Sequence, residues 1–382
     1  MNLHYLCFYT GDTEGSEYHG TVAADIKVGY VAETAKEAGY AVRILALNKT
    51  RQKGRQKAKI TEQNGIRVRH IASNGGGNFF AKTFNRLSFY CQIIRYFFRE
   101  VKRGDTVLLY HSMRTTPFLA FLKKFRNIPV ILEVEEIYAC SADGVQPYYK
   151  NEIRAIKKYR DYIFVNDYIP KELGIPEDHW IALYGVYRPV EGKKTEHEGK
   201  RVLYAGAIER LNQGAFRAVE AARYLPSDYE MRIIGKGEPQ DMEALSQRIQ
   251  QVNELCGREV VRYDGFRSGG ELDRYMLDCD IGLGAYPIQT SYSNYIFPSK
   301  LVSYMCRRLK VVTGRAECYE NTPFASQWFF YDANDGESIA KAILEAGKDT
   351  GEPTENDTIL ELHRAFLARL ISYRQNRNWF HG

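Results

Sequence analysis

The sequence predicts an α/β protein with two domains, each built around a parallel sheet. Segments with strand and helix patterns alternate along nearly all of the 382 residues, as in βαβ units. A chain of this length is too long for one compact core. Residues 191–200 (EGKKTEHEGK) carry no apolar side chain, which is typical of a linker. We therefore expect an N-terminal domain at 1–184, a linker at 185–200, a C-terminal domain at 201–350 and a helical tail at 351–382.

The first half opens with the strand LHYLCFY (3–9), followed by a long polar loop up to Asp25. A helix is expected at 23–38, where Gly39 ends it, and the strand AVRILAL (41–47) completes a βαβ unit. The loop is much longer than the tight GxGxxG turn of a dinucleotide-binding fold. The expected elements that follow are strands at 66–71, 105–112, 129–136 and 161–166 and helices at 82–103 and 116–125.

In the second half, glycine turns follow directly after apolar strands. Val202–Ala205 leads into Gly206, Met231–Ile234 leads into a second glycine turn, and FPSK places Ser299 and Lys300 at the start of a helix. At such points a parallel sheet exposes backbone N–H groups and a helix N-terminus to an anionic ligand. Serine and lysine are suited to binding phosphate oxygens. Three such points in one half indicate a pocket for a nucleotide diphosphate. The tail has helical periodicity at 357–375.

Composition is that of a globular protein, with 44% hydrophobic and 26% charged residues. The seven cysteines are scattered singly, with no CxxC or Cys/His pair at metal-ligand spacing, so we interpret them as reduced thiols of a cytoplasmic protein. The N-terminus does not resemble a signal peptide. No window reaches the ~20 apolar residues that a membrane-spanning helix needs.

Charge is divided unevenly along the chain. Residues 1–185 hold 27 basic and 19 acidic residues, a net charge of +8, and the remainder has a net charge of −2. The basic residues concentrate in Lys49–Lys59, expected as an exposed loop, and in the aromatic helix Lys82–Arg103. A basic amphipathic helix can lie on an anionic membrane surface, although its aromatic face can equally belong to the core. No nucleic-acid-binding motif accompanies the charge, so we expect no nucleic acid partner.

The order and spacing of these motifs resemble the GT-B glycosyltransferases, family 4 in particular. The second half carries the resemblance in LYAGAIERLNQG, IIGKG, the segment REVVRYDGFRSGGELDRYMLDCDIGLGAYP, and FPSKLVSYMCRRLKVVTG. In the first half, EAGYAVRILAL and PVILEVEE are similar to two strands of the family. The resemblance implies two Rossmann-like domains that face each other across a cleft, with the last helix returning to the N-terminal domain.

The sequence departs from the family 4 pattern at several functional positions. Tyr295 and Ser303 occupy the places of the two glutamates around the phosphate helix, one of which usually holds the donor ribose. Ala207 and Gln213 replace the two cations that usually neutralise the diphosphate, and Glu135 stands where the family has a histidine. The chain is therefore either a divergent branch with its own donor chemistry or a partner protein that has lost activity.

The candidate donor site takes its residues from the glycine turns and the phosphate helix. Lys300 is expected to place a point charge on the diphosphate, with Ser299 as the helix cap after Pro298. Gly206 would allow close approach of the backbone. For each residue the alternative is an ordinary surface or turn role. The remaining candidates are Arg210 and Lys236 for the phosphates, and Asn294 and Tyr292 for the sugar or base.

The candidate acceptor side lies in the first half. Glu133, Glu135 and Glu136 end a predicted parallel strand, where open sheets bind ligands, and alternation puts Glu133 and Glu135 on one face. A carboxylate there could act as general base on an acceptor hydroxyl, or it could pair with nearby basic residues. His111 also ends a strand. Gly15, Ser16, His19 and Gly20 resemble the acceptor-side loop of the family.

We therefore expect a glycosyltransferase that moves a sugar from a nucleotide-diphosphate sugar, UDP-linked by resemblance, to a carbohydrate or lipid-linked acceptor in polysaccharide or glycoconjugate synthesis. The resemblance implies retention of configuration, no metal and no other cofactor, and the sequence has no Asp-x-Asp motif. Closure of the domains would exclude water from the donor. Two alternatives stay open: a nucleotide-sugar epimerase, and a non-catalytic subunit that activates a partner transferase.

Overall fold

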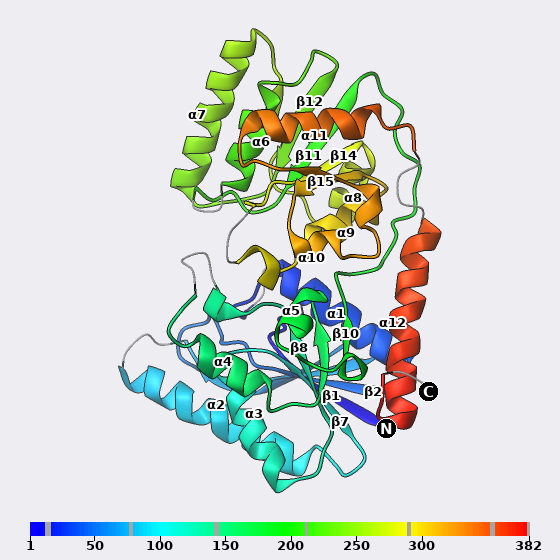
Figure 1. Cartoon of the computed structure of the whole chain (residues 1–382). Coiled ribbons are helices and arrows are strands. Elements are labelled where there is room, and N and C mark those ends of the chain that lie inside the picture. Colours follow the sequence, from blue (N-terminus) through cyan, green and yellow to red (C-terminus); the bar gives the residue numbers. More distant parts are fainter. Residues whose placement is uncertain are drawn as a thin grey trace. The chain divides into compact units, whose positions relative to one another are not determined.

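The computed structural model describes residues 1–11, 17–75, 79–140, 145–210, 213–288, 292–351 and 356–379. The chain forms two compact units (Figure 1). Unit 1 comprises Met1–Val186 together with Arg364–Gly382, and unit 2 comprises Tyr187–His363. The expected linker contains neither helix nor strand before Lys200, and from Tyr187 onward it belongs to unit 2. None of the helices in the described ranges combines the length and the hydropathy that a membrane crossing requires.

Unit 1 is built on a sheet with the strand order β10-β9-β8-β7-β1-β2-β5-β4. All neighbouring pairs are parallel except β4 and β5, which pair antiparallel at one edge. Central strands such as β8 are buried along their whole length, as expected for a sheet covered on both faces. The strands are β1 (Asn2–Cys7), β2 (Ala41–Ala46), β4 (Lys59–Gln63), β5 (Ile66–His70), β7 (Thr106–Tyr110), β8 (Val130–Val134), β9 (Asp161–Phe164) and β10 (Trp180–Ala182), and β3 (Arg55–Gln56) pairs separately with β6 (Ser73–Asn74).

The helices of unit 1 begin and end where the local sequence favours it. The Thr21 hydroxyl caps α1 by accepting a hydrogen bond from the Ala24 N–H at 3.3 Å, and Gly39 adopts a φ of +87° just after the helix. Helices α1 and α12 lie next to each other (Figure 1), with the rings of Tyr30 and Phe366 stacked 6.0 Å apart. The helices are α1 (Val22–Glu37), α2 (Phe79–Arg99), α3 (Thr115–Leu122), α4 (Tyr149–Ile156), α5 (Tyr168–Glu172) and the last part of α12 (Asn356–Asn376).

Unit 2 contains an all-parallel sheet with the strand order β13-β12-β11-β14-β15-β16. Helix α11 packs against α6, β15 and β16, and the buried side chains between them form the core of the unit. Pro239 starts α7, and Gly257 ends it with a φ of +62°. The strands are β11 (Lys200–Ala205), β12 (Tyr229–Ile234), β13 (Val261–Tyr263), β14 (Ile281–Gly284), β15 (Lys310–Gly314) and β16 (Trp328–Tyr331); the helices are α6 (Gly214–Ala222), α7 (Pro239–Cys256), α8 (Gly269–Leu277), α9 (Ser299–Met305), α10 (Glu317–Glu320) and α11 (Gly336–Lys348).

The two basic segments differ in part from the sequence-based expectation. Lys49–Lys59 is largely exposed, but it is not wholly an irregular loop, because β3 lies within it and β4 starts at its end. The aromatic helix runs from Phe79 to Arg99 rather than from Lys82 to Arg103. Its last predicted residues instead form the turn before β7, in which Gly104 has a φ of +94°.

Candidate functional site

In each unit, the order of the strands reverses between two neighbouring strands. In unit 2 the chain passes from β11 outward to β12 and β13, and then returns to β14 on the other side of β11. In unit 1 the corresponding neighbours are β1 and β7. Open α/β sheets bind ligands outside the carboxyl ends of the strands at such switch points. The switch point of unit 2 lies where Gly206 follows β11.

Glycine is required at Gly235, and Gly206 is closely packed, in the two turns beside this switch point. A Cβ atom on Gly206 would lie 2.6 Å from the Nζ of Lys300. Gly235, after β12, has a φ of +149°, and a Cβ there would lie 1.8 Å from the carbonyl oxygen of Gly206. The Gly206 N–H donates to the Ile234 carbonyl at 3.1 Å, which holds the two turns together. The absence of side chains therefore allows the two backbones to touch and leaves the lysine amine against the first turn.

Lys300 is the cation at this point. Its Nζ lies 4.3 Å from the ring centre of Tyr204 and 4.9 Å from that of Tyr286, so the ammonium rests between two aromatic faces. Within the described residues no carboxylate forms an ion pair with Lys300. Burial lowers the pKa of Lys300 to about 7, because desolvation disfavours the charged amine. The site therefore holds a partly exposed lysine, packed against two aromatic rings, that has no ion-pair partner among the described residues.

The other predicted donor cations, Arg210 and Lys236, contact side chains of their own. Arg210 is exposed, and its Nε forms an ion pair with Asp241 at 2.6 Å. Lys236 is also exposed, with its Nζ 4.5 Å from the ring centre of Phe266. Ser299 is not the cap of α9: Pro298 holds that position in an extended conformation, and no side chain caps the helix. Of the predicted donor cations, Lys300 therefore lies next to Gly206, whereas Arg210 contacts Asp241 and Lys236 contacts Phe266.

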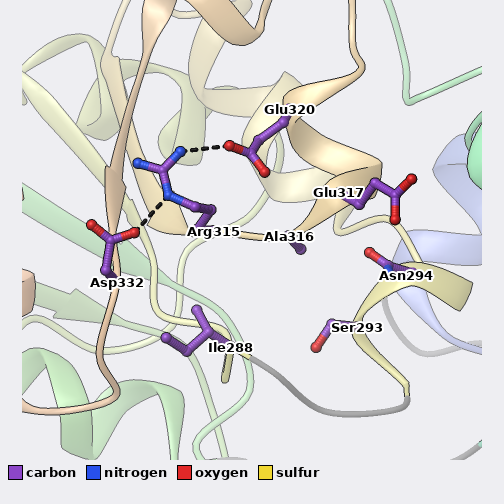
Figure 2. Close-up of a pocket in the computed structure, with 8 residues that line it drawn as sticks. All are labelled: Ile288, Ser293, Asn294, Arg315, Ala316, Glu317, Glu320 and Asp332. Atoms are coloured by element: carbon purple, nitrogen blue, oxygen red, sulfur yellow. Dashed lines mark hydrogen bonds and ion pairs between the residues drawn. The ribbon is translucent and has the colours of Figure 1, made fainter.

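A cavity of about 320 Å³ lies beyond the carboxyl ends of β14, β15 and β16 (Figure 2). Figure 2 shows the Arg315 guanidinium between Asp332 and Glu320, with both ion pairs at 2.5 Å. The Asn294 side chain also lines the cavity, and its Oδ1 accepts a hydrogen bond from the Cys318 N–H at 3.2 Å. The cavity is lined by Ile288, Ser293, Asn294, Arg315, Ala316, Glu317, Glu320 and Asp332.

Sequence reasoning missed most residues of this cavity. Only Asn294 was among the predicted candidates, although Arg315 directly follows β15 and Asp332 directly follows β16. The rule that ligands bind at the carboxyl ends of parallel strands could have found both residues. Two of the positions that depart from family 4 are not among the lining residues: Tyr295 ends the short 3-10 helix that begins with Ser293 and Asn294, and the Ser303 hydroxyl accepts a hydrogen bond from Arg307 at 2.9 Å.

Unit 1 buries a cluster of acidic residues at the end of β8. Glu133 has no exposed surface, and its carboxylate accepts a hydrogen bond from the hydroxyl of Tyr5 on β1. Glu135 is partly exposed and forms an ion pair with the Nζ of Lys27 on α1 at 3.2 Å. The same Lys27 amine donates to the Leu183 carbonyl at 2.7 Å. Burial, reinforced by the charge of Glu135, raises the pKa of Glu133 to about 8, and Lys27 and Tyr5 oppose that rise.

His111 is buried within a separate hydrogen-bonded group. Its Nε2 lies 2.8 Å from the Oε1 of Glu152, and its Nδ1 lies 2.7 Å from the hydroxyl of Thr116. The Glu152 carboxylate also accepts hydrogen bonds from the N–H groups of Tyr138 and Ala139. A substrate could reach either ring nitrogen only by breaking one of these bonds.

The predicted acceptor-side loop is described only in part. Gly15 and Ser16 lie outside the described residues. His19 is exposed, and its backbone N–H donates to the Lys49 carbonyl at 2.9 Å. Gly20 packs closely, since a Cβ there would lie 2.3 Å from the Cγ2 of Thr10. The backbone of His19 and Gly20 is therefore fixed against the segments that follow β1 and β2.

Glu133 gives a prediction for the dependence of stability on pH. Its pKa is about 8 in the folded protein against about 4.5 without the fold, so the folded state binds more protons between these pH values. Wild-type stability should therefore lose this contribution as pH rises through the window. We expect Glu133→Gln, which stays neutral and can still accept from Tyr5, to become progressively more stable than the wild type as pH increases from 5 to about 8.

The measurement is chemical denaturation of both proteins at a series of pH values. Glu172→Gln, at an exposed position on α5, serves as the control and should follow the wild-type curve. A constant difference between Glu133→Gln and wild type across the window would show that Glu133 is ionised in the folded protein.

No protein-family model matches the sequence, and a search among curated proteins gives no match either. Solved structures match over nearly the whole chain. Sucrose-phosphate synthase from Thermosynechococcus elongatus has a TM-score of 0.70 at 13% identity, covering 99% of this chain and 98% of its own. Anabaena HepE in complex with UDP has a TM-score of 0.61 at 12% identity, covering 99% and 98%.

An E. coli structure described as trehalose-6-phosphate bound with UDP-2-fluoro glucose has a TM-score of 0.68 at 10% identity, covering 97% of this chain and 99% of its own. These proteins are glycosyltransferases of GT-B architecture. The two parallel-sheet units, each with its switch point, agree with that architecture. The chain therefore has the GT-B fold.

Proposed function

We propose that the protein is a glycosyltransferase that uses a UDP-sugar as donor. The observation that carries the proposal is the Lys300 amine, which lies against the Gly206 turn at the switch point of unit 2 and forms no ion pair with any carboxylate of the described ranges. A lysine whose pKa is lowered by desolvation is stabilised in its charged form by any ligand that brings negative charge to it. Two of the similar structures contain UDP or a UDP-sugar derivative, which supports a uridine diphosphate as that ligand.

In this proposal Lys300 binds the diphosphate and stabilises the negative charge that develops on it as the sugar leaves. The glycine turn at Gly206 lets the phosphates approach the backbone, next to Pro298 and Ser299 at the start of α9. Arg210 and Lys236 would contribute only by leaving Asp241 and Phe266. Asn294, with Tyr292 beside it, would contact the sugar or the base from the cavity. In this proposal these cations stabilise the negative charge of the departing diphosphate, and the reaction uses no metal or other cofactor.

On the acceptor side, Glu135 is the best placed general base. Its carboxylate is partly exposed, whereas Glu133 is fully buried and the nitrogens of His111 are both engaged. The charges of Glu135 and Lys27 both act on Glu133. We infer an acceptor that is a carbohydrate or a lipid-linked carbohydrate, transfer with retention, and a role in polysaccharide or glycoconjugate synthesis on the cytoplasmic side of a membrane.

A non-catalytic role is the second candidate, and one observation favours it. Tyr295 and Ser303 stand where glycosyltransferases of family 4 carry glutamates, and the Ser303 hydroxyl accepts a hydrogen bond from Arg307. A subunit that activates a partner transferase needs no nucleotide. Affinity for UDP therefore separates the two candidates.

The test combines calorimetry with product analysis. Wild-type protein is titrated with UDP, and then incubated with UDP-, GDP- and dTDP-sugars with and without a panel of glycan acceptors. Binding of UDP together with acceptor-dependent sugar transfer is the expected result. A changed sugar in the donor without an acceptor would identify an epimerase. Absence of UDP binding would contradict the transferase proposal and favour the non-catalytic subunit.

A further inference from the structure

Helix α2 of unit 1 carries an apolar stripe that the core does not cover. Phe84, Leu87, Ile94 and Phe98 recur at spacings of three, seven and four, which return to the same face of a helix. Each of these side chains is exposed, between 39% and 64%. Exposed apolar residues that occur singly are normal, but a continuous stripe of this kind marks an interaction surface.

A different face of the same helix supplies the core. Ile93, Tyr96 and Phe97 are almost fully buried. The Tyr96 hydroxyl lies 2.9 Å from the Nδ1 of His4 on β1, which fixes the helix against the sheet. The exposed stripe therefore cannot turn inward without removing these residues from the core.

The stripe continues onto the neighbouring helix α3 and the 3-10 turn η1 (Lys123–Phe125) that follows it. Helices α2 and α3 lie side by side (Figure 1), and the rings of Tyr90 and Phe118 join them at 4.6 Å. Arg126, directly after Phe125, donates to the carbonyls of Phe97 and Val101 at the end of α2. Phe121 and Phe125 pair edge to face and are both more than half exposed. We call the six side chains the apolar patch: Phe84, Leu87, Ile94, Phe98, Phe121 and Phe125.

Basic residues border the apolar patch. Arg95 and Arg99 are exposed on α2 next to the stripe, and Lys124 is exposed in η1. Arg55, from the basic segment Lys49–Lys59, lies over the Phe84 ring at 5.2 Å and so joins that segment to the patch. Helix α2 itself contains no acidic residue.

The acidic residue that directly follows α2 does not offset this charge at the patch. Both Glu100 carboxylate oxygens face arginines of the sheet, at 3.9 Å from Arg43 and 3.7 Å from Arg69. The border charges identified in the described part of the chain, Arg55, Arg95, Arg99 and Lys124, are therefore all positive.

We propose that the apolar patch and its basic border form a docking surface for an anionic lipid bilayer. The apolar side chains would enter the region between the lipid headgroups and the acyl chains, and the arginines and lysines would contact the lipid phosphates. A second copy of this chain fits less well, because two such surfaces would place like charges opposite each other. The proposed partner of unit 1 is thus an anionic bilayer. This inference rests on the proposed function in one respect, the assignment of a lipid-linked acceptor.

The experiment is co-sedimentation of the purified full chain with phosphatidylcholine vesicles and with vesicles that also contain phosphatidylglycerol. We expect the protein to bind only the vesicles that contain phosphatidylglycerol, and we expect this binding to weaken as the salt concentration rises. The double variant Leu87→Ser/Phe125→Ser should bind about tenfold or more weakly, because it removes the two most exposed apolar side chains of the patch. Arg95→Gln/Arg99→Gln should also weaken binding, since basic residues near an anionic leaflet attract it.

Matched controls come from unit 2. Tyr224→Ser/Leu255→Ser removes two apolar side chains of comparable exposure, 48% and 69%, and should bind vesicles like the wild type. Lys341→Gln/Lys348→Gln removes two exposed charges from α11 and should do the same. Cys91 offers an independent readout, because it is exposed on the stripe while Cys7, Cys140, Cys279, Cys306 and Cys318 are buried. A polarity-sensitive dye on Cys91 in a Cys256→Ser background should report an apolar environment only with anionic vesicles.

The proposal is overturned by three results: no binding at low salt, equal binding to both kinds of vesicle, or binding that Leu87→Ser/Phe125→Ser leaves intact. Self-association without lipid that the same double variant abolishes would identify a second copy as the occupant instead. Vesicle binding is measured without nucleotide, and UDP titration is measured without vesicles. A failure of membrane docking is therefore distinguishable from a failure of the transferase proposal.

Discussion

Lys300→Met is expected to bind UDP about 10- to 150-fold more weakly than the wild type, while its weak affinity for uridine stays nearly unchanged. The loss corresponds to about 1.5–3 kcal/mol, the range for a hydrogen bond to a charged group. Methionine keeps the length of the side chain between Tyr204 and Tyr286 but removes the amine. Calorimetric titration of both proteins with UDP and with uridine measures the effect.

The dependence on pH provides an internal check on the same prediction. The pKa of Lys300 is about 7 in the free protein, and a bound diphosphate should raise it because it favours the charged amine. Binding therefore takes up a proton above pH 7, and wild-type affinity for UDP should fall as pH rises from 7 to 9. The phosphate itself titrates near pH ~6 and is already ionised in this window. Lys300→Met should show a flat profile over the same range.

The free energy of unfolding of the nucleotide-free protein should increase with pH, whereas the affinity for UDP decreases. A lysine has a pKa of about 10.4 in an unfolded chain, so between about pH 7 and 10 the unfolded protein binds more protons at this position. Wild-type stability should consequently rise with pH across this window, whereas that of Lys300→Met should not. At pH 7 we expect the variant to be the more stable protein.

Lys341→Met on α11 serves as the control for loss of a lysine, and it should change neither UDP affinity nor its pH profile. Equal losses for UDP and uridine, or no loss for either, would remove Lys300 from the nucleotide site. A stability gain without loss of affinity would mean that the lysine is buried for another reason.

The sequence predicts the fold through features that act locally. Alternating strand and helix patterns identify both parallel sheets, because apolar runs such as β8 must be buried on two faces. The glycine after β11 and the lysine after FPS could be placed at one site because both follow from the carboxyl-edge rule. The structure brings these two residues together, with a Gly206 Cβ position only 2.6 Å from the lysine amine.

Features that depend on contacts between segments distant in the sequence could not be predicted from local sequence patterns. The environment of Lys300 comes from Tyr204 and Tyr286, which belong to different strand ends. Helix α2 has apolar residues on two faces, so its periodicity does not show that Phe97 is buried and Phe98 exposed. The face that supplies the core is the one that carries Ile93, Tyr96 and Phe97, and the Tyr96 hydroxyl contacts His4 on β1.

Glu135→Gln is expected to lower the rate of sugar transfer by about 10²–10⁴-fold, the usual contribution of a general base. The carboxylate is the partly exposed member of the cluster, and its ion pair with Lys27 holds it at the end of β8. Affinity for UDP should not change, because the proposed nucleotide site is made by residues of unit 2. Transfer to the acceptor is measured at saturating donor, with release of UDP in the absence of acceptor as a second readout.

Two variants distinguish a base from a residue that only positions Lys27. Glu135→Asp keeps a carboxylate and should retain more activity than Glu135→Gln if the group accepts the proton of the acceptor hydroxyl. Lys27→Met leaves Glu135 in place but removes its partner, so a purely structural pair would give equal losses of activity and stability in Lys27→Met and Glu135→Gln. Glu136→Gln, at the next position, is the matched control and should transfer sugar like the wild type. If Glu135→Gln also transfers at the wild-type rate, the base must lie elsewhere, and Glu135 serves only to neutralise the buried Lys27 beside Glu133.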